Sequence, residues 1–268
     1  MVRRKIFNLK NNLFRIIKSS SILKKSINNI IDTQCLFGET FRVINTNGSW
    51  SFGVSEVDKY KGWIKSSALG SYMDYNHFIS CTRTFIYTKA DIKSEIITYL
   101  PLRSRVKVIE KKNDWAKLDI SINKKFLTGY VINSHILNKD KIIQNWVDYA
   151  ELFLSTPYRW GGRDSIGIDC SALLQLSKSF SGEDLPRDSI DQFEFFKKSK
   201  NYKIISNPLF ENFFRGNIIY WKGHIAIVFN KKKLIHASAF HGIVKLENIK
   251  KVVERINKPF YLIKEKFD

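Results

Sequence analysis

The sequence predicts an α+β fold, in which two small β-barrels precede a domain that packs a helix on an antiparallel sheet. The first observation is a series of short strand-like runs, separated by turn residues, within residues 34–69. The second is that residues 84–137 repeat the order of these runs. The third is an apolar helical spacing after residue 170, followed by further strand-like runs from residue 217 onward.

Residues 1–30 are predicted to be a basic, partly ordered and solvated extension. The first 31 residues contain eight basic residues and no acidic one. Lys10, Arg15 and Lys18 interrupt every candidate for the hydrophobic core of a signal peptide, so we expect a cytoplasmic location. The alternatives for this segment are a weak membrane-surface contact or organelle targeting.

The repeat places one barrel in residues 31–74 and a second in residues 75–139. Its clearest marker is Gly-Tyr-Val at 129–131, which answers Gly-Trp-Ile at 62–64. The three cysteines are an odd number and lie far apart, so a disulfide framework is not expected. Cys35 and Cys81 have apolar neighbours and should pack as small hydrophobic residues.

The remaining residues, 140–268, are predicted to form a single domain. Helical spacing covers residues 142–154 and ends before Pro157. A second helix should begin at Cys170 with Asp169 as its cap, because an aspartate there can accept hydrogen bonds from the first backbone N–H groups. A third helix is expected at residues 190–198, followed by strands at 217–221, 224–229, 233–239 and 243–246.

The composition indicates a globular chain and says little about partners. Of the 268 residues, 44% are hydrophobic and 14% aromatic, which argues against disorder. The net charge of +20 comes from lysines spread along the whole chain, without a basic groove lined by stacking aromatic residues. We therefore expect no nucleic-acid partner. The longest apolar runs are far too short to span a bilayer, so no transmembrane segment is expected.

Cys170 is the candidate nucleophile. At the start of a helix, backbone N–H groups and the helix dipole favour a thiolate, which attacks carbonyl carbon. Gly161 and Gly162 allow a tight turn before it, and Trp160 offers a flat apolar surface to a ligand. Packing of Cys170 as an ordinary buried cysteine is the alternative.

Two histidines are placed to assist it. If residues 229–231 form a three-residue hairpin loop, His224 lies directly opposite His236, and both rings share one face of the sheet. A loop of even length would separate them. His241 is a competing candidate, whereas His77 and His135 lie in the barrels and receive no role.

Several short motifs together resemble the NlpC-type cysteine peptidases, papain-like enzymes that act on murein peptides. They are W-G-G at 160–162, D-C-S at 169–171, L-P-R-D-S at 185–189, G-H-I-A-I-V at 223–228 and I-H-A-S at 235–238. The resemblance covers most of residues 147–260. It implies a papain-like domain with Cys170 as nucleophile, His224 as base and His236 as the residue that orients the base. Ala172 stands where many members have glycine.

The two barrels look like bacterial SH3-like domains. In front of such a peptidase, they resemble the γ-D-glutamyl-L-diamino-acid endopeptidases of cell-wall peptide recycling. That resemblance implies that Tyr60 lines the pocket, although Lys59 replaces the usual glycine before it. It also implies further substrate contacts: Asp169 with Tyr60, and less strongly Glu39, for a free α-amine; Ser171 for backbone; and Arg187 with Ser189 for the α-carboxylate of D-glutamate.

The implied activity is hydrolysis of the bond between γ-D-glutamate and a diamino acid. The substrate would be a murein tripeptide or tetrapeptide that begins with free L-alanine. No metal or organic cofactor is implied. A non-catalytic peptidoglycan-binding protein and a wall-remodelling amidase or hydrolase on the same scaffold are the alternatives. The sequence does not decide between meso-diaminopimelate and lysine.

Overall fold

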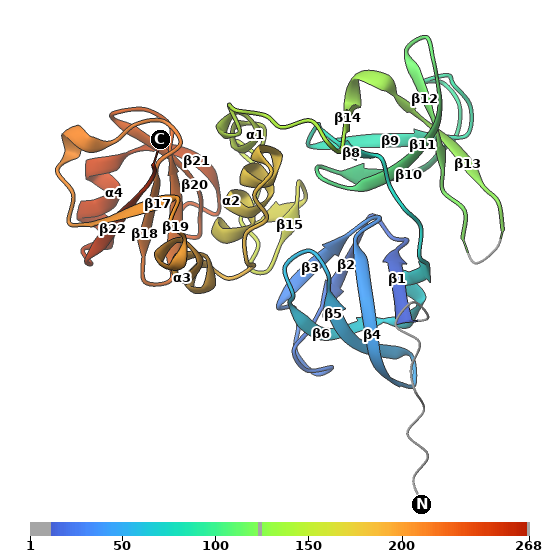
Figure 1. Ribbon diagram of the computed structural model, residues 1–268, viewed down its shortest axis with the longest axis horizontal. Helices are drawn as coiled ribbons and strands as arrows, with labels where there is room; N and C mark the ends of the chain where they lie inside the picture. Colours follow the sequence, from blue (N-terminus) through green and yellow to red (C-terminus); the bar gives the residue numbers. More distant parts are fainter. Residues whose placement is uncertain (1–11, 123–124, 267–268) are drawn as a thin grey trace, which may run out of the picture. The chain divides into compact units, whose positions relative to one another are not determined.

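The computed structural model describes residues 12–122 and 125–266 and divides into two compact units, Met1–Lys139 and Asp140–Asp268 (Figure 1). The first unit holds the two SH3-like barrels and the second holds a mixed helix and sheet domain, so the predicted α+β class is confirmed. In the described residues, no helix combines the length and the apolar character needed to cross a bilayer.

The first barrel is built around a five-stranded sheet with the order β6-β5-β4-β1-β7. Its core contains Cys35 and Phe41, and Cys35 packs there as a small hydrophobic residue, as predicted. A short ladder of β2 with β3 accompanies the sheet. The elements are β1 (Leu13–Ile16), β2 (Ser20–Leu23), β3 (Thr33–Leu36), β4 (Thr40–Asn47), β5 (Trp50–Ser55), β6 (Lys61–Lys65), the 3-10 helix η2 (Ser66–Ala68) and β7 (Leu69–Ser71).

The prediction of a solvated extension over residues 1–30 is wrong for its described part. Strand β1 pairs with both β4 and β7, and Ile16 and Leu23 are fully buried in the core of this barrel. Arg15, which seemed to mark a solvated segment, is buried and donates to the backbone carbonyl of Ser121 in the second barrel. The basic residues of this segment led the sequence analysis to miss strands β1 and β2. Residues 1–11, and the membrane-surface alternative that rests on them, lie outside the described residues.

The second barrel repeats this plan with seven strands in the order β10-β9-β13-β12-β11-β8-β14. The 3-10 turn after β13 corresponds to the turn after β6, so the predicted repeat is present in the structure. Cys81 packs against this core, and Phe37, from the turn after β3, is buried in it. The elements are β8 (His77–Ile79), β9 (Arg83–Tyr87), β10 (Ile96–Pro101), β11 (Arg105–Lys112), β12 (Trp115–Asp119), β13 (Thr128–Ile132), η3 (Asn133–His135) and β14 (Ile136–Asn138).

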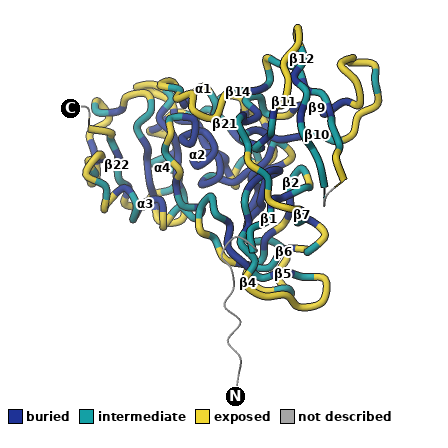
Figure 2. Tube along the Cα trace, turned by 45° about the vertical axis from the view of Figure 1, so that its right-hand side comes forward, coloured by how far each residue is buried: buried dark blue, intermediate teal, exposed yellow. Residues whose placement is uncertain are grey.

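The second unit packs helix α2 on a six-stranded antiparallel sheet with the order β17-β22-β18-β19-β20-β21. Helix α2 contacts α1, β19 and β20, and nearly all of its residues are buried (Figure 2). The elements are α1 (Val147–Glu151), β15 (Arg163–Asp164), β16 (Gly167–Ile168), α2 (Cys170–Lys178), η4 (Ser179–Ser181), α3 (Ser189–Lys198), β17 (Tyr202–Ser206), η5 (Phe210–Asn212), β18 (Ile218–Trp221), β19 (His224–Val228), β20 (Lys233–Ser238), β21 (Ile243–Asn248), α4 (Ile249–Ile256) and β22 (Phe260–Glu265).

The helix predicted at 142–154 is much shorter in the structure, because only α1 is regular. Tight turns surround it: Asp148 N–H bonds to the carbonyl of Asn145, and Leu154 N–H bonds to that of Glu151. The third predicted helix and the four predicted strands of this domain are confirmed within a few residues. The sequence analysis did not predict strands β17 and β22 or helix α4.

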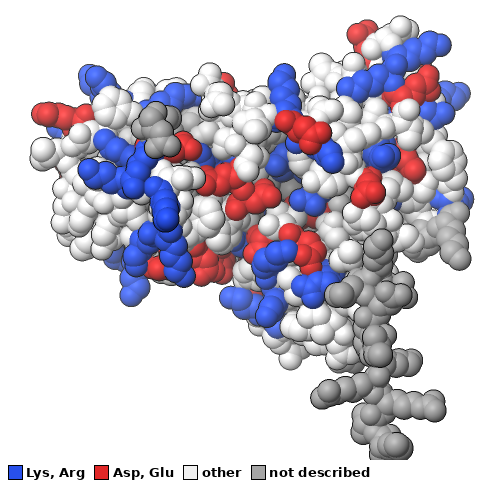
Figure 3. All heavy atoms as spheres, viewed as in Figure 1, with Lys and Arg blue, Asp and Glu red and all other residues white. Residues whose placement is uncertain are grey.

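Lysine and arginine side chains lie among acidic ones on the face drawn in Figure 3.

Candidate functional site

The start of α2 is built by its cap. Asp169 has extended backbone, and its carboxylate accepts the N–H of Ala172 at 2.9 Å, so the cap predicted from the sequence is confirmed. Cys170 is the first residue of the helix. Gly161 has a φ of 73°, and a Cβ on Gly162 would lie 2.2 Å from the carbonyl oxygen of Gly167. The two glycines therefore permit the tight turn that leads into the helix.

A cleft of about 410 Å³ opens beside Cys170 within the second unit. Its lining brings together residues from α2, from both histidine-bearing strands and from α4. Trp160 lies at this cleft and is 71% exposed, which leaves its ring available to a ligand. The lining residues are Tyr158, Trp160, Cys170, Trp221, Lys222, Gly223, His224, His236, Ser238, Ala239, Phe240, Arg255, Ile256 and Lys258.

The two histidines share one face of the sheet, but the predicted register is wrong by two residues. Val228 pairs with Leu234, so His236 faces position 226 rather than His224. The reason lies in the turn: the side-chain carbonyl of Asn230 accepts the N–H groups of Lys232 and Lys233, which moves the three-residue loop to 230–232. The loop length stays odd, and therefore the histidines become diagonal neighbours on the same face.

A chain of hydrogen bonds runs through these histidines. His224 Nε2 lies 2.8 Å from His236 Nδ1, and His236 Nε2 lies 2.9 Å from Glu247 Oε2. The two rings meet at 67° with their centroids 5.0 Å apart. Cys170 and the rings line the same cleft, which is the arrangement that acyl transfer by a cysteine requires.

The surroundings of Cys170 favour the neutral thiol over the thiolate. Burial raises the pKa of Cys170 to about 11 and the carboxylate of Asp169 adds to this, although hydrogen bonds from the backbone of Ile225 and Ser171 act in the opposite direction. The expectation that the helix start alone would give a thiolate is therefore not supported. The cost of desolvating the charge exceeds the stabilisation from the N–H groups.

The histidines are neutral as well. Burial lowers the pKa of His224 to about 3 and that of His236 to about 4. Burial acts to raise the pKa of Glu247, but hydrogen bonds from Arg255 and His236, with His241 close by, lower it to about 2. These shifts all favour a thiol, two neutral imidazoles and one carboxylate in the resting site.

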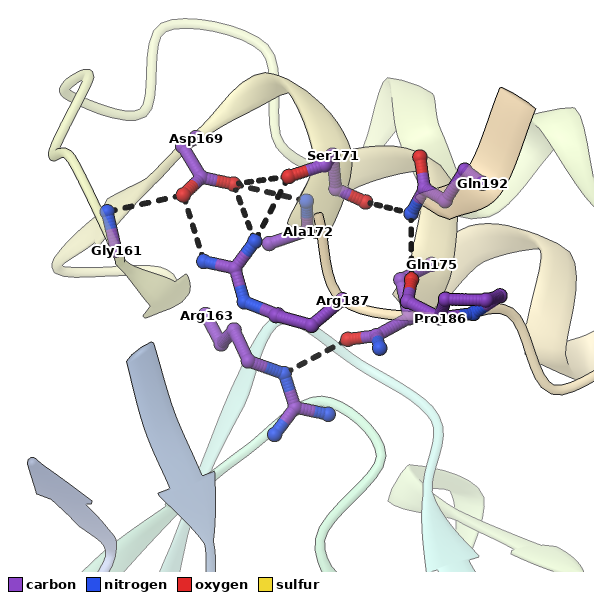
Figure 4. Close-up of polar contacts among 9 residues, drawn as sticks. All are labelled: Gly161, Arg163, Asp169, Ser171, Ala172, Gln175, Pro186, Arg187 and Gln192. Atoms are coloured by element: carbon purple, nitrogen blue, oxygen red, sulfur yellow. Dashed lines mark hydrogen bonds and ion pairs between the residues drawn. The ribbon is translucent and has the colours of Figure 1, made fainter. Parts of the chain in front are cut away.

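Asp169 is the centre of a buried network (Figure 4). Arg187 donates to it twice, at 2.6 and 3.0 Å, and Gly161 N–H donates at 2.9 Å. Ser171 donates from its hydroxyl at 3.2 Å and accepts from Arg187 at 2.8 Å. With the bond from Ala172, the carboxylate has about as many donors as it has lone pairs.

This network changes how two predicted contacts are read. The guanidinium of Arg187 is 1% exposed and its fork faces Asp169, so in this structure it pairs with a protein carboxylate rather than facing the cleft. Ser189 begins α3 and is half-buried. Neither residue lines the cleft around Cys170.

Tyr60 and Glu39 belong to the first unit. Tyr60 packs partly against the core of the first barrel, with the Lys25 ammonium 5.4 Å from its ring centroid. Glu39 is buried and accepts the N–H of Leu36 at 2.8 Å. Lys59 has a φ of 62°, which confirms that this position requires the left-handed backbone that glycine adopts at little cost.

Glu247 and Arg255 are site residues that the sequence analysis missed. Glu247 lies on β21, where Lys245 is the direct partner of His236, and Arg255 comes from α4. Neither belongs to a recognisable motif. Only a prediction of the β20–β21 register could have pointed to Glu247, which is again a diagonal neighbour of a histidine.

Comparison with protein families assigns three segments of the chain. Residues 155–262 match the NlpC/P60 family. Residues 24–69 match the bacterial dipeptidyl-peptidase Sh3 domain, and residues 82–136 match the bacterial SH3 domain.

Curated relatives carry similar segments. A Gamma-D-glutamyl-L-lysine dipeptidyl-peptidase of Bacillus subtilis (strain 168) is 29% identical over 181 residues, which cover 61% of this chain and 58% of the relative. Dipeptidyl-peptidase 6 of Lysinibacillus sphaericus is 28% identical over 109 residues, which cover 40% of this chain and 36% of that protein. The matched segments thus span less than two thirds of either relative.

Solved structures share the fold. An NlpC/P60 family protein from Bacillus cereus superposes with a TM-score of 0.70 at 14% identity, covering 88% of this chain and 94% of the other. An NlpC/P60 endopeptidase from Photobacterium damselae gives a TM-score of 0.64 at 14% identity, covering 97% and 74%. At such identities the likeness concerns the fold.

Proposed function

Because residues 155–262 form an NlpC/P60 domain that follows bacterial SH3 domains, we propose that this chain is a cysteine endopeptidase. The observation that carries the proposal is the hydrogen-bonded chain from His224 through His236 to Glu247, in the same cleft as Cys170. A protein that only bound peptidoglycan would have no use for a hydrogen-bonded imidazole pair in the same cleft as a thiol.

In the proposed mechanism, His224 takes the proton of the Cys170 thiol while the sulfur attacks the carbonyl carbon of the scissile amide. The backbone N–H of Cys170 helps to hold the oxyanion. The carbon–nitrogen bond then breaks, and the imidazolium returns its proton to the leaving amine. A water molecule, activated by His224, hydrolyses the thioester and restores the thiol.

The proposed substrate is a short murein peptide with a free N-terminal L-alanine, cut between γ-D-glutamate and the diamino acid. The name of the Bacillus subtilis relative supports the γ-D-glutamyl bond, and the names of both relatives support release of a dipeptide. Asp169 and Tyr60 would recognise the free amine, with Glu39 as a further candidate. Because Asp169 has many donors, the amine would replace the weakest of them, the 3.2 Å bond from Ser171.

Arg187 and Ser189 would bind the α-carboxylate of D-glutamate. Because the Arg187 fork pairs with the Asp169 carboxylate in this structure, the substrate carboxylate would have to displace part of that pairing. A role in recycling of wall peptides, in the cytoplasm, belongs to the same proposal, since a free alanine amine is absent from intact wall.

The test is incubation of the purified protein with L-Ala-γ-D-Glu-diaminopimelate and, separately, with the lysine tripeptide. Mass spectrometry should detect the L-Ala-γ-D-Glu dipeptide and the free diamino acid. The Cys170→Ala variant should fold normally and release neither product. Dipeptide release by that variant, or no cleavage of either peptide by the unaltered protein, would contradict the proposal.

A further inference from the structure

The carboxylate of Glu247 lies beyond His236, at the end of the hydrogen-bonded chain that starts at His224. Its Oε2 is 2.9 Å from His236 Nε2, and its side chain is only 11% exposed. A cysteine and its histidine base need one orienting group, and His236 already supplies it. Glu247 is therefore a charged residue that the proposed mechanism leaves without a task.

Residues from two further segments hold this carboxylate in place. Arg255 donates to both of its oxygens, at 2.7 and 2.8 Å, and His241 Nε2 lies 3.1 Å from Oε1. Helix α4 packs on the face of the sheet that carries Ala226 and Leu234. Alternate residues of a strand share a face, so His224 and His236 lie on that same face. Arg255, which belongs to α4, can therefore reach the carboxylate. The paired bonds from Arg255 keep the carboxylate ionised, and Arg255 and His236 hold it from two sides.

An ionised carboxylate can only accept hydrogen bonds, and this decides where the protons of the two rings are. His236 must donate through Nε2 to Glu247, so its Nδ1 has the lone pair. His224 must then donate through Nε2 to that nitrogen, and its own Nδ1 keeps a lone pair. Two neutral imidazoles in series with a carboxylate have no other arrangement that satisfies both hydrogen bonds.

We infer that Glu247 is a positioning residue that acts through His236 and fixes His224 as the Nε2–H tautomer, so that Nδ1 is the atom that takes the proton of the nucleophile. The part of this inference that assigns a base to Nδ1 rests on the proposed function. The tautomer itself does not. The same carboxylate stabilises the imidazolium that forms when His224 takes up a proton.

The competing explanation is that Glu247 and Arg255 only tie α4 to the sheet. In that case the pair would not determine the tautomers of the histidines. Its loss would lower the free energy of unfolding and would not change which ring nitrogens are protonated. Glu247→Gln separates the two explanations, because glutamine has nearly the same shape and can both donate and accept. Glu254→Gln is the matched control, since Glu254 is exposed on α4 and makes the same change of charge.

The first measurement is ¹⁵N NMR of the imidazoles, which reports tautomers without any need for activity. In the unaltered protein near neutral pH, His224 and His236 should each show a protonated Nε2 and an unprotonated Nδ1. Glu247→Gln should give mixed tautomers in both rings, and Glu254→Gln should leave the spectrum unchanged. An Nδ1–H tautomer of His224 in the unaltered protein, or unchanged tautomers in Glu247→Gln, would overturn the inference.

The second measurement is kcat/KM on the tripeptide. Glu247→Gln should lower it by about 10- to 100-fold with little change in KM, as is usual when a group behind a ligand or base is removed. In a variant that already carries His236→Ala, Glu247→Gln should lower kcat/KM by less than about a further twofold, because the effect of Glu247 passes through the His236 ring. Losses that multiply in the double variant would overturn the positioning role. If neither tripeptide is cut although the tautomers are as expected, the proposed function fails and the tautomer assignment stands.

Discussion

Replacing Asp169 by asparagine should destabilise the second unit strongly although the helix cap survives. Asparagine caps helices about as well as aspartate, so the bond from Ala172 N–H can persist. What disappears is the charge opposite the Arg187 guanidinium, which is 1% exposed and bonded to both carboxylate oxygens. Leaving such a charge buried without its partner costs about 3–5 kcal/mol.

Urea unfolding followed by circular dichroism measures this cost as a fall in the transition midpoint at constant slope. Arg187→Met should cost less, because Gly161, Ala172 and Ser171 still donate to the carboxylate. The double variant should be more stable than Asp169→Asn alone, since it removes the unpaired charge.

Asp191→Asn is the matched control, because Asp191 is exposed in the first turn of α3 and its loss should cost no more than about 1 kcal/mol. A loss below about 1 kcal/mol for Asp169→Asn would refute the argument. It would mean that the charge of Asp169 does not compensate the buried charge of Arg187.

Four further predictions concern the site and the first barrel. His224→Ala should abolish peptide cleavage and His236→Ala should reduce it less, while a larger loss in His241→Ala than in His236→Ala would show that the orienting residue was misassigned. The pKa values of His224 and His236 in the folded protein both lie below the ordinary histidine value of 6.5. As the pH falls, the unfolded chain therefore takes up protons at a higher pH than the folded chain does. The free energy of unfolding should therefore fall as pH drops from 6.5 toward 4 and 3, and urea midpoints that stay constant across this window would contradict the shifts. Lys59→Gly should be about 1 kcal/mol more stable than Lys59→Ala in thermal unfolding, because the position has a positive φ, and equal melting temperatures would exclude strain there. N-acetylation of the tripeptide should lower kcat/KM by about 100-fold or more, and Tyr60→Phe should narrow that difference; equal rates on both peptides would point to a wall-remodelling hydrolase.

Much of the site follows from the sequence because its signals are local. The cap, the nucleophile and the start of α2 lie within four consecutive residues, and an aspartate before a helical apolar spacing has few other readings. The sharing of one face by the two histidines needed only an odd loop length, which the sequence analysis assumed and the structure shows. The class of fold followed in the same way from short strands and one amphipathic helix.

Other features depend on contacts between distant segments, and no local pattern contains them. The sequence analysis missed strand β1, which lies among basic residues. Its strand character depends on pairing with β4 and β7, which lie more than twenty residues away. The loop moved by one residue because the Asn230 side chain, rather than loop length, sets the register. The pKa of the Cys170 thiol is raised because other segments pack around this half-buried side chain in the folded chain, an effect that its helix position cannot reveal.

Residue type and spacing specify which residues could perform the chemistry: a nucleophile, a cap and two imidazoles. Folding sets the direction in which their pKa values shift, because it partly buries Cys170 and brings Glu247 and Arg255 from β21 and α4 to the histidine pair. Protonation depends on solvent exclusion and on charges a few ångströms away, and both arise only when the chain has folded.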